Sequence, residues 1–461
     1  PQTLFFSQSG DFENFESGTE DDDGMVYTIG STEVAVIRFL ASTRSLIVGT
    51  SGGEFVVRAS GNDEPITPKS VQIKQQTNYG AADHVPAQVG NTVIFLQRAK
   101  RKLHELQFNF DVDGYIGADV TLISEQEISF QREPDNILWA VRADGQLACM
   151  TYKREEKVIG WTRQIIGGVF GTGDAVVESV AILPGDLDED QVYLIVKRTI
   201  NGNTERYVEY IENFDFGTDV NDAIFVDSSL SYTGVTNTLA GAEAADQTTI
   251  TLTSGSAFAS SGSIKIGNEF ITYTGKSTND LTGCVRGVQG VAAAHASGAT
   301  VTQAAISLSG LAHLEGQSVQ ILADGAVHAN KTVSSGAVSL ERYVTKAHAG
   351  LGYNSTLTTL RVEGGSIQGT AQGKIKRINE IVVRLNRSVG LKVGKDVNNL
   401  DIVPFRSSAD DMDAPIPLFT GDKEIEFDGE YGPDGQLTIR QDQPLPMNVL
   451  AIYASLTTFD Q

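Results

Sequence analysis

The chain has 461 residues, 47 of them glycine, and a formal net charge of −23 at pH 7. Its length allows several hydrophobic cores, and its glycine-rich composition with few amphipathic helical stretches indicates mostly β structure. The negative charge argues against binding to nucleic acid or to anionic membranes, because phosphate groups are bound by clustered Lys and Arg. No run approaches the ~20 apolar residues that span a bilayer, so we expect no membrane span. Only two cysteines are present, which excludes a disulfide-stapled secreted fold.

The chain begins with a strand-like run at Leu4–Ser7, followed by a polar turn around Phe12 and Phe15. An acidic run comes next, formed by Glu20, Asp21, Asp22 and Asp23. Because the first residue is Pro1 and not Met, we expect that an upstream region was removed or was never included.

Four hairpin-like blocks follow, each an apolar run, a polar or glycine-containing turn and a second alternating run. Their starts lie roughly 45–55 residues apart, which is typical of propeller blades. We therefore predict an all-β protein with a β-propeller-like domain of four blades over residues 1–222. The blocks are Ser45–Val57, Val93–Phe108, Ile137–Tyr152 and Val192–Ile211.

A change in composition marks the middle of the chain. Residues 238–304 are rich in Ala, Gly, Ser and Thr and carry few charges. With the preceding strand-like run Phe225–Tyr232, they predict an inserted small β-barrel module with its flanking strand over residues 223–304.

The remainder is predicted to be β structure as well. Residues 305–345 form a short β segment with hairpin signals at Asp324-Gly325 and Ser335-Gly336. Residues 346–461 form a C-terminal β domain, which either returns to the propeller or makes a platform. Within it, Lys374–Arg387 fits a strand and a weakly amphipathic helix about equally well.

Few residues suggest chemistry. Asp186, Asp188 and Asp190 have the spacing of a calcium loop, but Gln191 and Lys197 stand where that loop needs Gly and Glu. A solvated loop is therefore favoured over a metal site. The six histidines are scattered without zinc spacing, and no nucleophile elbow, P-loop or dinucleotide fingerprint occurs. We expect no cofactor and no catalytic residue, although the sequence leaves a carboxylate pair for glycoside hydrolysis open.

Three further sets of residues have a structural interpretation and a functional one. Trp139 lies inside an apolar run, so a core position is favoured over a carbohydrate platform. Cys149 and Cys284 lie in strand-like sequence and are interpreted as buried free thiols. The sequence has one dense cationic cluster, formed by Arg98, Lys100, Arg101 and Lys102. We expect it to be a hairpin tip or a subunit contact and not a DNA-binding site.

An ordered series of segments resembles one known family. These segments are Leu4–Phe15 (LFFSQSGDFENF), Ser45–Phe55 (SLIVGTSGGEF), Val93–Arg98 (VIFLQR), Gly114–Thr121 (GYIGADVT), Val158–Gly168 (VIGWTRQIIGG), Leu311–Gly325 (LAHLEGQSVQILADG), Gly350–Tyr353 (GLGY), Ile416–Asp422 (IPLFTGD) and Gln441–Ala451 (QDQPLPMNVLA). Together they resemble the tail nozzle proteins (stabilisation or tail tubular type) of short-tailed bacteriophages. The resemblance runs through nearly the whole chain outside the insert.

The resemblance implies a non-enzymatic structural subunit of the virion tail. It implies a homohexameric ring below the portal and adaptor, with tail fibres or spikes as further partners. Such a ring retains the packaged genome and passes DNA without binding it specifically. Acidic loops, with Glu20–Asp23 and Asp186–Asp190 as candidates, would line or close the bore, unless they only add solubility to the exterior. A receptor- or glycan-binding tail module and a propeller hydrolase are the alternatives.

The insert has a resemblance of its own, carried by Ile264–Gly275 (IKIGNEFITYTG), Leu281–Gly290 (LTGCVRGVQG) and Ala292–Gly298 (AAAHASG). It is similar to a small β-barrel of many phage structural proteins that is named after a half-domain of ubiquitin-activating enzymes. The resemblance implies a decorating module outside the ring, with Cys284 as a structural residue.

Overall fold

The computed structural model describes residues 2–61, 64–121, 125–185, 189–363, 370, 373–410, 414–427 and 429–459. Within these residues the protein consists of β-strands and short 3-10 turns, which confirms the all-β prediction. The same part of the chain has no helix of the length and apolarity needed to cross a membrane. The chain divides into two compact units, residues 1–166, 173–197 and 206–211 in the first and residues 167–172, 198–205 and 212–461 in the second.

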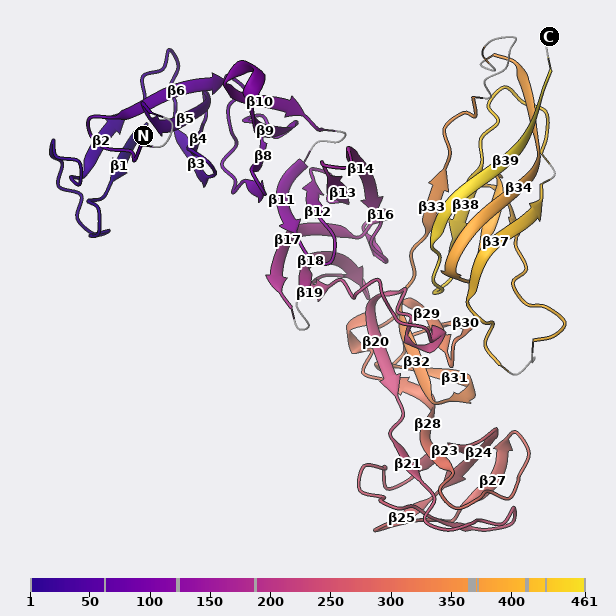
Figure 1. Ribbon diagram of the computed structural model, residues 1–461. Helices are drawn as coiled ribbons and strands as arrows, with labels where there is room; N and C mark the ends of the chain where they lie inside the picture. The colour runs from indigo at the N-terminus through magenta and orange to yellow at the C-terminus, as the bar shows by residue number, and fades with distance from the viewer. Residues whose placement is uncertain are drawn as a thin grey trace. The chain divides into compact units, whose positions relative to one another are not determined.

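Four antiparallel sheets of three or four strands follow one another in chain order in the described residues up to Ile211, shown from indigo to magenta in Figure 1. The first has strands β3 (Ile37–Ser42), β4 (Leu46–Thr50), β5 (Gly53–Ala59) and β6 (Val71–Thr77). The second has β7 (Ala87–Val89), β8 (Thr92–Leu96), β9 (Leu103–Asn109) and β10 (Gly114–Asp119), with the 3-10 turn η1 (Phe110–Val112) before β10. The third has β11 (Glu125–Gln131), β12 (Ile137–Arg142), β13 (Leu147–Lys153) and β14 (Val158–Gln164). The fourth has β17 (Val176–Pro184), β18 (Asp190–Ile200) and β19 (Asn203–Tyr210).

Each of the four predicted blocks forms a hairpin. The first three are the central hairpins of four-stranded sheets, and the fourth is the last hairpin of a three-stranded sheet. Their apolar runs are explained by burial on both faces. Because successive strand residues point to opposite faces, Val93 and Phe95 of β8 pack toward the first sheet, whereas Ile94 and Leu96 pack toward the third. Strand β12 repeats this pattern between the second and fourth sheets.

Two short hairpins occur beside these four sheets, one at the N-terminus and one after the third sheet in the sequence. Strands β1 (Thr3–Phe6) and β2 (Met25–Thr28) pair with each other and pack on the outer face of the first sheet, where Leu4 and Ile29 join its core. Strands β15 (Val169–Phe170) and β16 (Gly173–Asp174) form the extra hairpin. The propeller prediction is not confirmed, because no sheet among the described residues closes on itself.

The second unit begins with a sheet of order β20-β32-β29-β30. Its strands are β20 (Asp227–Thr233), β29 (Ser318–Ala323), β30 (Ala326–Thr332) and β32 (Lys346–Leu351), with β31 (Ala337–Val344) pairing with β28. The turn η3 (Val220–Asp222) precedes β20, and the turn η4 (Ala312–Leu314) precedes β29. Since β20 pairs with β32 across more than a hundred residues, the segment between them leaves the sheet and returns to it.

That segment carries a small β module with its own core. Its larger sheet contains β21 (Thr236–Thr238), β23 (Gly262–Ile266), β24 (Glu269–Tyr273), β27 (Val285–Gln289) and β28 (Thr300–Ser309). Its smaller sheet contains β22 (Thr249–Thr251), β25 (Gly275–Ser277) and β26 (Asp280–Thr282). Residues of both sheets, among them Ile250, Ile264 and Leu281, share one buried cluster.

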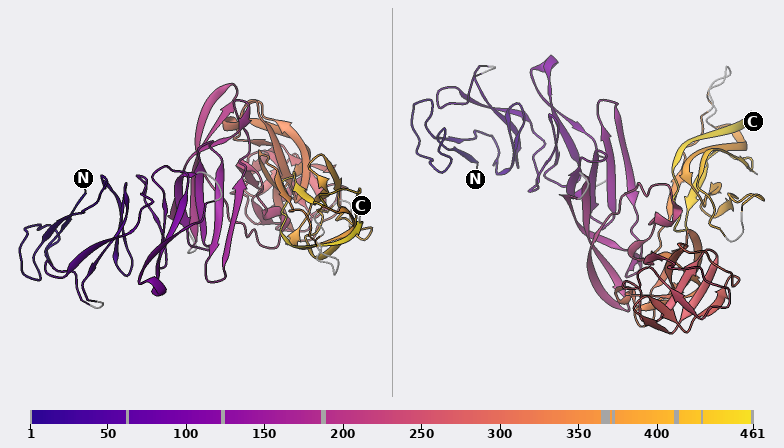
Figure 2. Two further views of the ribbon diagram at one scale, coloured as in Figure 1. Left: turned by 90° about the horizontal axis from the view of Figure 1, so that it is seen from above. Right: turned by 60° about the horizontal axis from the view of Figure 1, so that its bottom comes forward.

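The C-terminal part of the second unit has two further sheets, shown in orange and yellow in Figures 1 and 2. One contains β33 (Ser355–Thr358), β35 (Lys392–Asp396), β36 (Asn399–Ile402) and β38 (Thr438–Gln441). The other contains β34 (Ile375–Ser388), β37 (Phe419–Glu426) and β39 (Val449–Phe459). The segment that fitted helix and strand equally, Lys374–Arg387, is therefore almost entirely strand β34. Its alternate residues Ile381, Val383 and Leu385 are buried between the two sheets.

Candidate functional site

The predicted acidic run lies in the connection between β1 and β2, which we name the acidic loop (residues Gln8–Gly24). The pairing of β1 with β2, from Thr3 opposite Thr28 to Phe6 opposite Met25, fixes both ends of this loop. Within the loop, the Gln8 amide donates to the Asn14 carbonyl at 2.9 Å, and the Ser9 amide donates to the Asp22 carbonyl at 3.0 Å. The loop therefore has an ordered conformation made by its own backbone.

The four predicted acidic residues come together in one turn of this loop. The Asp23 carboxylate accepts a hydrogen bond of 2.9 Å from the Glu20 amide, so its charge is used to shape the turn. Glu20 and Asp21 lie 3.8 and 3.6 Å from the ammonium of Lys69, with all three side chains largely exposed. Exposed pairs of this kind contribute about 0–1 kcal/mol to stability. Since a single ammonium faces the carboxylates of Glu20–Asp23, the turn keeps a net negative charge.

The acidic loop combines this charge with exposed aromatic rings. It contains seven Asp or Glu residues and no Lys or Arg. Phe12 is 83% exposed and Phe15 is 51% exposed. A loop with this charge repels polyphosphate, while its uncovered rings leave apolar area available for a protein partner.

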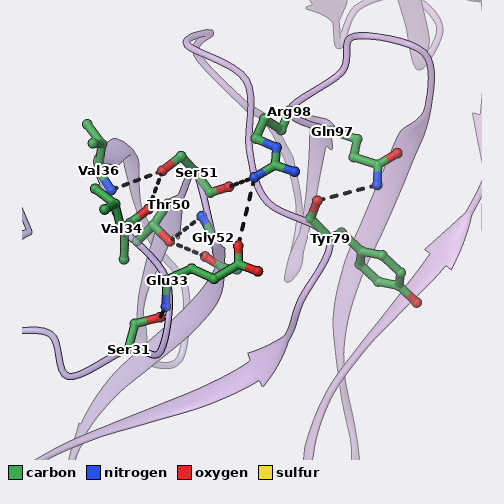
Figure 3. Close-up of polar contacts among 12 residues, drawn as sticks. Ser31, Glu33, Val34, Val36, Thr50, Ser51, Gly52, Tyr79, Gln97 and Arg98 are labelled. Carbon is green, nitrogen blue, oxygen red and sulfur yellow. Dashed lines mark hydrogen bonds and ion pairs between the residues drawn. The ribbon is translucent and has the colours of Figure 1, made fainter.

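The junction between the first two sheets is held by polar contacts around Ser51 (Figure 3). The Ser51 hydroxyl donates to the Val34 carbonyl at 2.8 Å and accepts from the Val36 amide at 3.1 Å. The Arg98 guanidinium donates to the Ser51 carbonyl at 3.3 Å and lies 3.9 Å from the Glu33 carboxylate. Arg98, from the predicted cationic cluster, thus connects the two sheets within one chain.

The rest of the cationic cluster lies at the tip of the β8–β9 hairpin. Lys102 pairs with Asp119 at 2.7 Å, and this hydrogen bond holds the pKa of the Asp119 carboxyl well below its ordinary value. Lys100 occupies the turn with a positive φ of 51°. The hairpin-tip interpretation is confirmed by these positions, and two of the four cations already have partners within the chain.

Of the predicted calcium-loop residues, Asp186 and Asp188 lie outside the described residues, and Asp190 has a structural role. Its carboxylate accepts hydrogen bonds from the Arg132 amide at 2.7 Å and the Glu133 amide at 3.2 Å. Asp190 thereby ties the fourth sheet to the loop that follows β11. In the described part of the chain, no three His, Cys, Asp or Glu side chains are grouped so that they could hold a metal ion.

We expect Asp190→Ala to lower the free energy of unfolding by about 1.5–3 kcal/mol. The substitution removes a charged acceptor, and the Arg132 and Glu133 amides then lose their hydrogen bonds to it. Asp190→Asn keeps one acceptor oxygen and should lose less. Urea unfolding followed by tryptophan fluorescence measures both variants. An Asp190→Ala protein as stable as the parent would contradict this role. A calcium-dependent rise in stability that Asp190→Ala abolishes would instead support the metal loop.

The inserted module contains a buried charged network that the sequence interpretation missed. Glu269 is 1% exposed and accepts two hydrogen bonds from the Arg286 guanidinium, at 2.8 and 2.7 Å. It also contacts His295 Nε2 at 2.8 Å and accepts from the Gly287 and Ala293 amides at 2.9 and 3.2 Å. The signal available in the sequence was an isolated Glu, Arg and His within a segment that has few charges.

This network changes the acidity of Glu269. Burial alone raises the pKa of its carboxyl, but the hydrogen bonds from Arg286 and His295 outweigh burial and lower the pKa from 4.5 to about 2. A pKa lowered by folding stabilises the folded state above the unfolded pKa, and this stabilisation is lost as the pH falls toward the folded pKa.

We therefore expect the stability of the inserted module to fall between pH 4.5 and pH 2. Hydrogen exchange of the backbone amides of residues 236–304, measured between pH 4.5 and pH 2, reports this loss of stability. Glu269→Gln has no carboxyl at this position, so its exchange should depend less on pH. Equal pH dependence in both proteins would contradict the assignment.

The remaining predicted residues are structural. Trp139 is 1% exposed, which confirms its core position, and both cysteines are buried and free. Burial raises the pKa of the Cys284 thiol, which makes its thiolate scarcer. His104 is buried against Tyr79 with ring centroids 4.0 Å apart, and His313 Nε2 contacts the Ser228 carbonyl at 3.0 Å.

No protein-family model matches the chain, and no curated protein is significantly similar to it.

Proposed function

We propose that this chain is a structural subunit of the tail nozzle of a short-tailed bacteriophage. In this proposal it is not an enzyme; it forms a homohexameric ring in the virion tail that retains the packaged genome and lets DNA pass on infection. The observation that carries the proposal is the ordered series of family-like segments, which occurs in both units and on both sides of the insert.

Physical properties of the chain agree with a conduit. A net charge of −23 disfavours phosphate binding, so a wall made from such subunits would let DNA pass with few contacts. The acidic loop carries seven Asp or Glu residues and no Lys or Arg. In this proposal it lies at the bore or at the contact between subunits. The repeated β sheets provide a rigid support, because each shares buried side chains with the next.

Native mass spectrometry with negative-stain electron microscopy of the purified chain tests the proposal. We expect a six-fold ring with a bore wide enough to admit a DNA duplex, and no DNA binding at physiological salt. A stable trimer without a channel would reject the conduit and favour the receptor- or glycan-binding alternative. Polysaccharide cleavage that depends on a carboxylate would favour the hydrolase.

A further inference from the structure

A groove lies between the first and second sheets, and its lining has a composition unlike the rest of this acidic chain. Its charged residues are three cations, Arg44, Arg58 and Lys74, and two carboxylates, Glu64 and Asp113, so the lining carries a net positive charge. Three aromatic residues, Phe108, Phe110 and Tyr115, contribute to it as well. We name it the cationic–aromatic groove. Its cavity measures about 240 Å³. Since pockets for small-molecule ligands usually measure about 300–1,000 Å³, this groove fits inserted side chains better than a free metabolite.

The aromatic residues form one connected surface. The Phe108 ring packs edge-on against Tyr115 with centroids 5.5 Å apart and against Phe110 with centroids 5.1 Å apart. Phe110 is nevertheless 81% exposed. An aromatic ring entering the groove would cover this apolar area and meet the existing rings in favourable edge-to-face geometry.

The cations of the groove are only partly neutralised. Arg58 lies 3.8 Å from the Asp113 carboxylate, and the Arg44 guanidinium lies 5.7 Å from the centre of the Phe108 ring. Among the described residues, no carboxylate pairs with Arg44 or Lys74. The chain has 58 Asp and Glu against 35 Lys and Arg, so carboxylates that could pair with these cations are plentiful on a second copy. The groove therefore suits a ligand that carries both a carboxylate and an aromatic ring.

The acidic loop has this chemistry. Phe12 and Phe15 alternate with Asp11, Glu13 and Glu16, and both rings are exposed. The loop of the same chain is held by its own hairpin and by Lys69. We propose that the acidic loop of a second copy of this chain docks in the cationic–aromatic groove, with a Phe ring against Phe108 and Phe110 and neighbouring carboxylates beside Arg44 and Lys74.

This contact uses two different surfaces of the subunit. Such a heterologous contact repeats from copy to copy and produces a closed ring or an open filament, depending on the rotation between subunits. The inference deepens the proposed function by naming a contact that would join neighbouring subunits of the ring. Because the contact depends on opposite charges, its assembly weakens as salt rises.

The test is charge reversal followed by rescue. We expect Arg44→Glu/Lys74→Glu and, separately, Glu13→Lys/Glu16→Lys to weaken self-association about tenfold or more in sedimentation velocity, because like charges then face each other. Combining all four substitutions restores opposite charges and should recover assembly. Lys100→Glu/Arg101→Glu is the matched control, since it reverses two cations of the β8–β9 hairpin tip, outside the groove, for which no ion pair is found among the described residues. Phe110→Ser gives an independent variant at an exposed position if charge reversal impairs folding.

The outcomes separate this inference from the proposed function. A parent chain that stays monomeric, groove variants that assemble like the parent, or a combined variant that does not recover assembly would each overturn the docking. If a six-fold ring forms regardless of the groove charges, the conduit proposal stands and the docking fails. If the groove mediates assembly into filaments without a channel, the docking stands and the conduit proposal fails.

Discussion

Glu269→Gln is expected to destabilise the inserted module by about 3–5 kcal/mol, because it removes the charge that compensates a buried guanidinium. The Arg286 side chain is 7% exposed and forms a two-pronged hydrogen bond with Glu269. With a neutral partner, the positive charge stays in a poorly solvated site. Replacing both residues with leucine removes both charges and should therefore cost less than Glu269→Gln alone.

Hydrogen exchange of peptides within residues 236–304 measures this loss directly. Both tryptophans, Trp139 and Trp161, belong to the first unit, so their fluorescence transition should stay at the denaturant concentration of the parent. Glu341→Gln serves as the control, because it breaks a pair with Lys331 in which Glu341 is 63% exposed, and it should cost less than about 1 kcal/mol. Unchanged exchange in Glu269→Gln would show that the network contributes little to stability.

Trp139→Ala is expected to destabilise the first unit by about 3–5 kcal/mol, the usual cost of truncating a buried tryptophan. The ring lies in the core between the third and fourth sheets, beside Val177 and Leu194. Its Nε1–H donates to the Gln131 side chain at 2.9 Å, so the truncation also leaves a buried amide oxygen without its donor.

Urea unfolding followed by far-ultraviolet circular dichroism measures this effect. Trp139→Phe keeps much of the ring volume and loses the hydrogen bond, so its stability should lie between those of the parent and Trp139→Ala. Val208→Ala, at a 73% exposed position of β19, should change stability by less than about 0.5 kcal/mol. If Trp139→Ala unfolded at the urea concentration of the parent, the sheet–sheet core would not depend on this ring.

The candidate site could be predicted in part. The acidic composition of Glu20–Asp23 predicted a negatively charged turn, and the turn exists. Its partner Lys69 was not predicted, because the contact joins the connection between β1 and β2 to the segment before β6. The groove was missed for the same reason, since Arg44 and Phe108 are 64 positions apart in the sequence and meet only when two sheets pack.

The sequence by itself determined the all-β class, the four hairpins and the core position of Trp139. These features follow from local patterns, because period-two alternation and glycine-containing turns act over a few residues. Tertiary structure alone decided that Lys374–Arg387 is a strand, since its pairing with β37 and β39 supplies the hydrogen bonds of an extended backbone. It also decided that Glu269, Arg286 and His295 form one buried network, because only the pairing of distant strands brings isolated charges together and removes water around them.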